Sequence, residues 1–339
     1  MLNLFKELDR KHPQRESGSP GAAKLAQAII NQASALNLKA VTGRIKVFHF
    51  QSSLLSFGLG SLITILVGIH LPLLGLILQA ILWLLLLREF KQPALARLMP
   101  GETKNIAVTI PARSKEVQKI ILTVPFDTSA FMPTPLGLKP QLYWGLILFL
   151  GSAVLGLQLS GILLGFPPLL FWSLLPLLLL VVSGVLPKKQ RVPSGLVGCS
   201  ALLECASILT RFRPSITTVI LYFTGAQALN SGVQKLPGLF KGDSPTYGLN
   251  LSPQDRPEIE IITREGFLPQ SGSPLLKELL TEVAAEKSIP IKCITTSEVT
   301  PSYPFLAKKL DVISLGIPTK ETNENLRELI VGFIRKIEH

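Results

Sequence analysis

Two long stretches of this chain contain no charged side chain. No Asp, Glu, Lys or Arg occurs between Lys46 and Arg88, and none occurs between Lys139 and Lys188. A helix that crosses a lipid bilayer needs about 20 mostly apolar residues, so each stretch is long enough for two such helices and a turn. The alternative is a set of buried core helices, but a core seldom needs so long a stretch without charge. We therefore expect two transmembrane hairpins, over residues 52–88 and 140–187.

Basic residues flank these stretches and predict an orientation. The first 46 residues are rich in Lys and Arg, Arg88 and Lys91 follow the first stretch, and Lys188 and Lys189 follow the second. Because basic residues favour the cytoplasmic side of a membrane, we expect a multi-pass integral membrane protein with both termini and its polar regions in the cytoplasm. A lipid bilayer is then one partner. The net charge of +12 is explained by this orientation, and no nucleic-acid motif accompanies it.

The remaining residues predict one further domain. Residues 1–21 are polar and typical of a flexible tail. Residues 22–50 favour a helix, either juxtamembrane or packed on the domain. Strand-like and helical segments alternate over residues 101–135 and 190–339, which predicts a cytoplasmic α/β domain with its sheet between helices. The second hairpin, residues 140–187, is then an insertion in this domain.

The order of these segments resembles metallopeptidase family 28, the zinc exopeptidases of the aminopeptidase Y/S type. The resemblance covers about residues 102–132 and 192–337. It rests on segments that follow the family's order: NIAVTIPA, IILTVPFDTS, SGLVGCSALLE, YFTGAQA, GLNLS, TPSYPF and IPTKETNENL. It implies a zinc-exopeptidase-like three-layer domain with a mixed sheet, in addition to the four transmembrane helices.

The resemblance also locates the positions where the family holds two zinc ions. At these positions the family has His and Asp ligands. Here the first His is replaced by Pro125, the bridging Asp by Ser194, a further ligand Asp by Ser252 and the last His by Pro318.

The catalytic positions of the family differ as well. Its general-base Glu corresponds to Gln227, the adjacent ligand Glu to Ala228, and a late Asp-His pair to Pro301 and Ser302. The one position that matches is Asp127, which in the family would orient a ligand His.

These replacements remove the chemistry of a di-zinc site. Proline and alanine have no metal-binding side-chain atom, and glutamine has no basic carboxylate. The histidines lie elsewhere, at His12, His49, His70 and His339, and no nucleophile elbow of a serine hydrolase is present. We therefore predict no catalytic residue, no metal ligand and no cofactor.

Two functions remain open at this point. The first is a catalytically inactive peptidase-like domain with a binding, scaffold or complex-assembly role and a protein partner of unknown identity. The alternative is a membrane-bound zinc-dependent aminopeptidase, or a related amide hydrolase, that uses atypical site residues and binds zinc.

Overall fold

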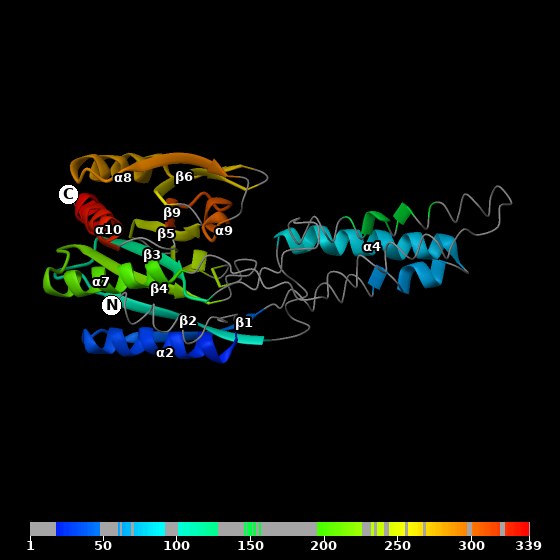
Figure 1. Cartoon of the computed structure of the whole chain (residues 1–339), viewed down its shortest axis with the longest axis horizontal. Helices are drawn as coiled ribbons and strands as arrows, with labels where there is room; N and C mark the ends of the chain where they lie inside the picture. The colour runs from blue at the N-terminus through cyan, green and yellow to red at the C-terminus, as the bar shows by residue number, and fades with distance from the viewer. Residues whose placement is uncertain are drawn as a thin grey trace. The chain divides into compact units, whose positions relative to one another are not determined.

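The computed structural model describes residues 18–47, 60–61, 63–68, 71–91, 101–127, 146, 148–150, 152–153, 156, 195–225, 232–233, 236–240, 244–254, 257–266, 269–296, 300–318 and 323–338. Two compact units make up the chain (Figure 1). Unit 1 comprises residues 1–47, 102–129 and 192–339. Unit 2 comprises residues 48–101 and 130–191. Of the family positions named above, Ser194, Gln227 and Ala228 lie outside the described residues, as do the four histidines.

A twisted mixed sheet forms the centre of unit 1. Its described strands are β1 (Ala40–Val47), β2 (Gly101–Ile110), β3 (Gln118–Pro125), β4 (Thr217–Thr224), β5 (Thr246–Gln254), β6 (Ile259–Glu265), β7 (Gln270–Ser271), β8 (Ile291–Thr296) and β9 (Val312–Pro318). Their order is β1-β2-β4-β3-β5-β9-β6-β7, and β8 pairs with β6. The strands β4, β3, β5 and β9 are parallel, whereas β2 and β6 run antiparallel to their neighbours β4 and β9.

The sequence explains why the central strands form. β4 has the sequence TTVILYFT, which is rich in the β-branched and aromatic residues that favour strands. All seven residues of β9 are buried, as expected for a parallel strand that is covered on both faces. Unit 1 is therefore a mixed α/β domain.

Helices cover both faces of this sheet. On one face, α7 (Leu196–Arg211), α8 (Pro274–Glu286) and α10 (Asn323–Glu338) pack on a large apolar cluster that includes Leu122, Leu251 and Leu315 of the strands. On the other face, η3 (Leu236–Phe240) and α9 (Tyr303–Leu306) pack on a smaller cluster around Val312. Because side chains alternate along a strand, Val312 and Leu315 of β9 point to opposite faces.

The segment expected to be a juxtamembrane helix has a different structure. Helix α2 (Pro20–Ala35) begins after Ser19, whose side chain accepts a hydrogen bond from the backbone of Ala22, and it is followed by strand β1. Leu25 and Ile29 of α2 are buried in the large apolar cluster of unit 1. The second half of the expected helix is thus a strand, and α2 packs on the domain itself.

The prediction of four transmembrane helices is contradicted, and with it the predicted integral membrane localisation. In the described part of the chain, no helix combines the length and the apolar character that crossing a bilayer requires. Helix α4 (Pro72–Lys91) illustrates the reason. Its uncharged part ends at Leu87, and about 16 residues rise only about 24 Å, less than the roughly 30 Å of a bilayer core. Much of residues 52–88 and 140–187 lies outside the described residues.

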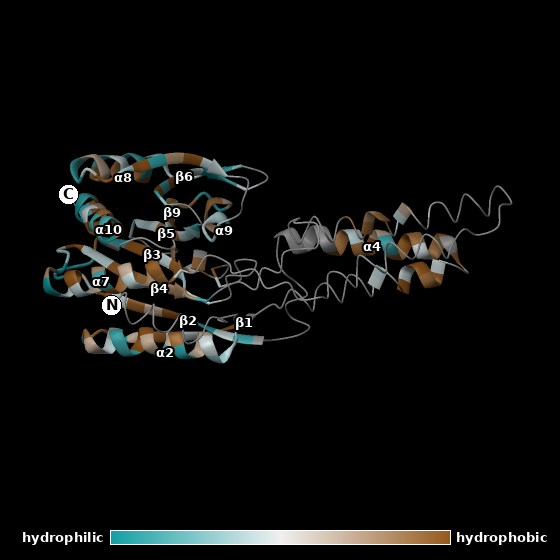
Figure 2. Ribbon diagram, in the orientation of Figure 1, coloured by the Kyte–Doolittle hydropathy of each residue, from teal (hydrophilic) through white to brown (hydrophobic). Residues whose placement is uncertain are grey.

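Polar side chains form several of the internal contacts in the described part of unit 2. The side-chain amide nitrogen of Gln79 on α4 donates to the hydroxyl of Ser61 at 3.2 Å and to the carbonyl of Leu148 at 2.9 Å. The side-chain oxygen of Gln79 accepts from the hydroxyl of Thr64 at 2.5 Å. The indole of Trp83 donates to Ser152 at 3.1 Å. Apolar residues occur along the described part of α4 (Figure 2), and several large ones are exposed. These are Leu73, Leu74, Ile77, Ile81, Leu84 and Leu85.

A close backbone contact fixes the start of α7 against the end of β3. Gly195 comes directly before α7, and a β-carbon at this position would lie 1.8 Å from the backbone oxygen of Pro125. Because the clash would be with backbone atoms, rotation of a side chain could not relieve it. Only glycine therefore allows α7 to begin at this distance from β3.

We predict that Gly195→Ala lowers the free energy of unfolding by about 1–3 kcal/mol, since the helix must move away from β3. Gly43→Ala is the control, because nothing lies within 4 Å of a β-carbon there, and it should change the free energy by less than about 0.5 kcal/mol. Urea denaturation followed by circular dichroism measures both. Equal stability of the two variants would contradict the close contact between the start of α7 and the backbone of Pro125.

Candidate functional site at the carboxyl ends of the parallel strands

The carboxyl ends of four neighbouring strands meet at one edge of the sheet in unit 1. β4, β3, β5 and β9 are parallel, so Thr224, Pro125, Gln254 and Pro318 end their strands on the same side. Open α/β sheets bind their ligands at this edge, because the loops that follow the strands converge there. This edge is the candidate functional site.

Three of the positions named from the family resemblance belong to this edge. Pro125 ends β3 and pairs with Thr224, and Pro318 ends β9 and pairs with Gln254. Ser252 of β5 pairs with Gly316 of β9. Pro125 and Pro318 are buried and Ser252 is half-buried. The fold therefore places these three residues on neighbouring strands at one edge of the sheet.

Two further predicted positions, Asp127 and Ser302, are buried in the fold. Asp127 follows β3 and has no exposed surface, and it interacts with its surroundings in the fold. Ser302, directly before α9, also has no exposed surface. Neither side chain is therefore available to a ligand from solvent.

A row of hydrogen-bonded polar side chains crosses the sheet just below this edge. Thr123, Asn250 and Ser314 are aligned on β3, β5 and β9. The Thr123 hydroxyl donates to the Asn250 side-chain oxygen at 2.8 Å, and the Asn250 amide donates to the Ser314 hydroxyl at 3.0 Å. Thr123 and Asn250 come two residues before Pro125 and Ser252, so they share a sheet face with them. The row is the floor of the candidate site.

The row continues into a buried carboxyl group on β6. Ser314 donates to Ser302 at 2.7 Å, and Ser302 donates to Oε1 of Glu265 at 2.7 Å. Thr300 donates to Oε2 of Glu265, and its hydroxyl lies 2.9 Å from those of Ser302 and Ser314. Glu265 is 1% exposed. One network therefore joins β3, β5, β9, β6 and the segment before α9.

Burial raises the pKa of Glu265 to about 7, because a buried carboxylate loses its hydration. The hydrogen bonds from Thr300 and Ser302 act in the opposite direction, since they stabilise the ionised form. Glu265 therefore changes its charge near neutral pH.

Sequence reasoning found Ser302 but missed its partners Glu265, Thr300, Ser314, Asn250 and Thr123. Each is an ordinary residue of a strand or turn when taken alone. The alternation of Asn250 with apolar neighbours in GLNLS is the only local signal of a polar row.

The residues at this edge do not fit a two-zinc centre. Zinc takes thiolate, imidazole or carboxylate ligands, and proline offers none of these. Among the residues that the structure describes, no group of three or more His, Cys, Asp or Glu side chains could hold a metal ion. Pro125 and Pro318 therefore supply no zinc ligand. The side chains of the polar row are hydroxyls and an amide that bond to one another and to the carboxyl of Glu265.

Comparison with known structures, but not with known sequences, agrees with this description of the fold. No protein-family model and no curated protein sequence matches the chain. A glutaminyl cyclase from an Acidobacteriales bacterium is similar in structure, with a TM-score of 0.54, 14% identity and coverage of 99% of this chain and 93% of that one.

Two aminopeptidases are also similar in structure. A leucine aminopeptidase precursor from Bacteroides thetaiotaomicron has a TM-score of 0.52 and 11% identity, covering 99% of this chain and 94% of that one. The LapA aminopeptidase of Legionella pneumophila has a TM-score of 0.51 and 8% identity, covering 99% and 72%. Identities this low show the fold alone. The chain has a peptidase-like fold of the kind found in aminopeptidases and glutaminyl cyclases.

We predict that Glu265 makes the stability of unit 1 depend on pH. The pKa of its carboxyl is about 7 in the folded state and about 4.5 in an unfolded chain. Between these values the folded state binds more protons at Glu265, so the stability that this group contributes is fully present below about pH 4.5 and is lost as the pH rises to about 7. The loss is up to about 3 kcal/mol.

Glu265→Gln, which resembles the protonated carboxyl, should remove most of this fall. The free energy of unfolding is measured by urea denaturation at several pH values between about 4.5 and 8. Glu278→Gln, a change at an exposed position of α8, is the control. In this variant the free energy of unfolding should still fall as the pH rises. If Glu265→Gln also keeps it, another group is responsible.

Proposed function

We propose that this chain is a binding protein that uses a peptidase-like fold without di-zinc hydrolysis. In this proposal, unit 1 holds a peptide segment of a partner protein at the carboxyl ends of β3, β5 and β9. The observation that carries the proposal is the set of side chains at those strand ends, which are Pro125, Ser252 and Pro318. They stand at the positions where the family resemblance would require metal ligands.

Loss of the ligands removes the electrophile and the activated water of a di-zinc exopeptidase. The similar structures include enzymes named as aminopeptidases and glutaminyl cyclases. Fold similarity does not transfer their activity, because activity depends on the residues of the site. What the fold does offer is the edge of the sheet at which such proteins bind their ligands.

The floor of the site supports a binding role. Thr123, Asn250 and Ser314 are each at most 4% exposed, and each is hydrogen-bonded to the next. A floor whose polar groups are satisfied is rigid, so it costs little ordering when a ligand binds. A peptide is the ligand that we propose, by analogy with the aminopeptidases of similar fold.

The first test is the zinc content of the purified full-length protein. We expect far less than one zinc ion per chain by elemental mass spectrometry, and no change in melting temperature when a chelator or excess zinc is added. A zinc ion that bound the folded state would raise stability by about 2.7 kcal/mol at 100 times its dissociation constant. Two tightly bound zinc ions, or a peptidase activity that a chelator abolishes, would overturn the proposal.

The second test looks for the ligand. A photo-crosslinking residue is placed at Ser252, which is half-buried at the site, and at Thr281 on α8 as a control. We expect a polypeptide adduct from position 252 that is absent at position 281, with the attached peptide identified by mass spectrometry. Equal labelling at both positions, or none at either, would contradict a peptide-binding site at this edge.

A second candidate is an amide hydrolase with atypical catalytic residues. The observation that favours it is Glu265, whose pKa of about 7 is suited to a general base. If this candidate is correct, hydrolysis of aminoacyl amides is detectable and Glu265→Gln lowers kcat/KM by about 100-fold or more. The burial of Glu265 and its hydrogen bonds to Thr300 and Ser302 weigh against it.

The scaffold or complex-assembly role belongs to the same proposal, because a bound peptide segment would tether its parent protein. Contact with a lipid bilayer and the existence of a protein partner, whose identity the sequence does not predict, stay predictions.

A further inference from the structure

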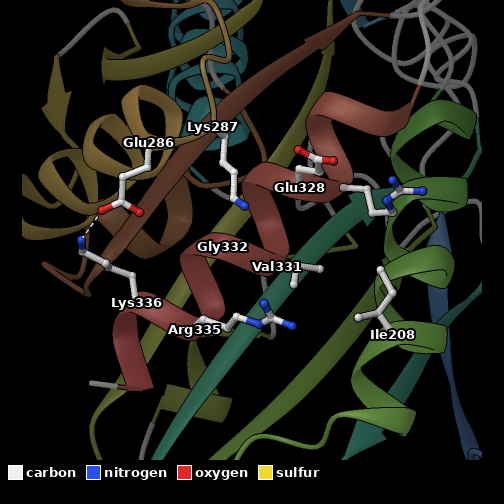
Figure 3. Close-up of a pocket in the computed structure, with 9 residues that line it drawn as sticks. Ile208, Glu286, Lys287, Glu328, Val331, Gly332, Arg335 and Lys336 are labelled. Atoms are coloured by element: carbon white, nitrogen blue, oxygen red, sulfur yellow. Dashed lines mark hydrogen bonds and ion pairs between the residues drawn. The ribbon is translucent and has the colours of Figure 1, made fainter.

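Unit 1 has a second hollow, on the sheet face that α7, α8 and α10 cover. Its volume is about 450 Å³, and it is lined by residues of these three helices (Figure 3). We name it the helix-layer groove. It is separate from the candidate site, because Thr123, Asn250 and Ser314 face η3 and α9 on the other side of the sheet.

Two of the cations that line the helix-layer groove are neutralised within the protein. Lys336 lies 2.6 Å from Glu286 and 3.3 Å from Glu282. Arg327 lies 3.3 Å from Glu324 and 4.0 Å from Glu204. These ion pairs tie α10 to α8 and α7.

Two other cations remain available to a ligand. Lys287, at the end of α8, and Arg335, on α10, are exposed and line the groove. Among the described residues, neither forms an ion pair with an acidic side chain. Glu328 is the remaining acidic residue of the lining. The named side chains comprise four cations and five carboxylates, so the groove has no net excess of positive charge; what it offers an anionic group is the two cations Lys287 and Arg335, which no carboxylate pairs with in the described part of the chain.

The floor of the groove is apolar. Val331 is 8% exposed, and Ile208 of α7 is half-buried against the large apolar cluster. Figure 3 shows Val331 and Arg335 on the side of α10 that faces α7, toward Ile208 of α7. A ligand could thus place an apolar group on Ile208 and Val331 while its charge approaches Arg335.

Close helix packing keeps this geometry fixed. A β-carbon on Gly332 would lie 2.5 Å from Cγ1 of Val283, so α10 rests directly on α8 at this point. This contact fixes the backbones of α8 and α10 relative to each other near Gly332. The cations are therefore held on a rigid frame.

We infer that the helix-layer groove binds a small molecule that has one carboxylate or phosphate group and an apolar body. Its volume is within the range of about 300–1,000 Å³ that is usual for small-molecule sites. Lys287 and Arg335 recognise the anionic group, and Ile208 and Val331 contact the body. Glu328 would repel a ligand with several anionic groups. This inference does not depend on the proposed function.

The probes are phenylbutyrate, phenyl phosphate and the neutral phenylbutanol, titrated into the full-length chain by isothermal calorimetry. We expect the two anions to bind and the alcohol to bind about tenfold or more weakly, because charge-assisted hydrogen bonds are lost. A preference for one anion identifies the headgroup. Equal binding of the alcohol, or no binding of either anion, would overturn the inference.

Variants assign the binding to the groove. Arg335→Gln and Lys287→Gln should each weaken phenylbutyrate binding by about tenfold, whereas Lys277→Gln should leave it unchanged. Lys277 is an exposed lysine on the same helix α8 and does not line the groove. Ile208→Ala tests the apolar contact and should weaken phenylbutyrate and phenylbutanol equally.

Circular dichroism confirms that each variant is folded before titration. If Arg335→Gln binds phenylbutyrate as tightly as the parent protein, or if Lys277→Gln weakens it equally, the ligand binds elsewhere and the inference is wrong.

Discussion

The hydrogen bond between Asn250 and Ser314 holds the two halves of the buried polar network together. On one side, Asn250 accepts from Thr123 across β3 and β5. On the other, Ser314 donates to Ser302 and so reaches Glu265. Burying so many polar groups is unfavourable unless each is paired. A slip of one residue between β5 and β9 would turn these side chains to the opposite face and break the pairs. The network therefore specifies the register of the parallel strands.

That register also decides what stands at the carboxyl edge. Ser252 lies two residues beyond Asn250 and Pro125 two residues beyond Thr123, on the same face of the sheet. The hydrogen-bonded row thus lies directly beneath Pro125 and Ser252. Proline offers no ligating side-chain atom to a metal ion, and this chemistry is the reason for proposing binding in place of hydrolysis.

The two units satisfy their polar groups in different ways. Unit 1 has a large apolar core, and its described residues include a buried polar row on one sheet face. The described part of unit 2 has polar contacts around Gln79 inside and exposed apolar residues such as Leu73 and Leu84 on α4. The long uncharged stretches suggested membrane-spanning helices, but a stretch without charge limits only the composition of a segment. How much of it becomes one continuous helix depends on turns and packing, and the uncharged part of α4 is too short to span.

The sequence by itself determined that Pro125 and Pro318 bring no metal-binding side-chain atom to the strand ends, because proline has none in any fold. It also determined most of the strands and helices of unit 1, since β-branched runs such as TTVILYFT and periodic runs such as α8 form their elements locally. Only the tertiary structure decided that Glu265 meets Thr300 and Ser302, which are distant in the chain, and that Lys287 and Arg335 share a groove. Such meetings depend on the register of the sheet and on helix packing, and both are set by contacts between segments that local sequence patterns do not encode.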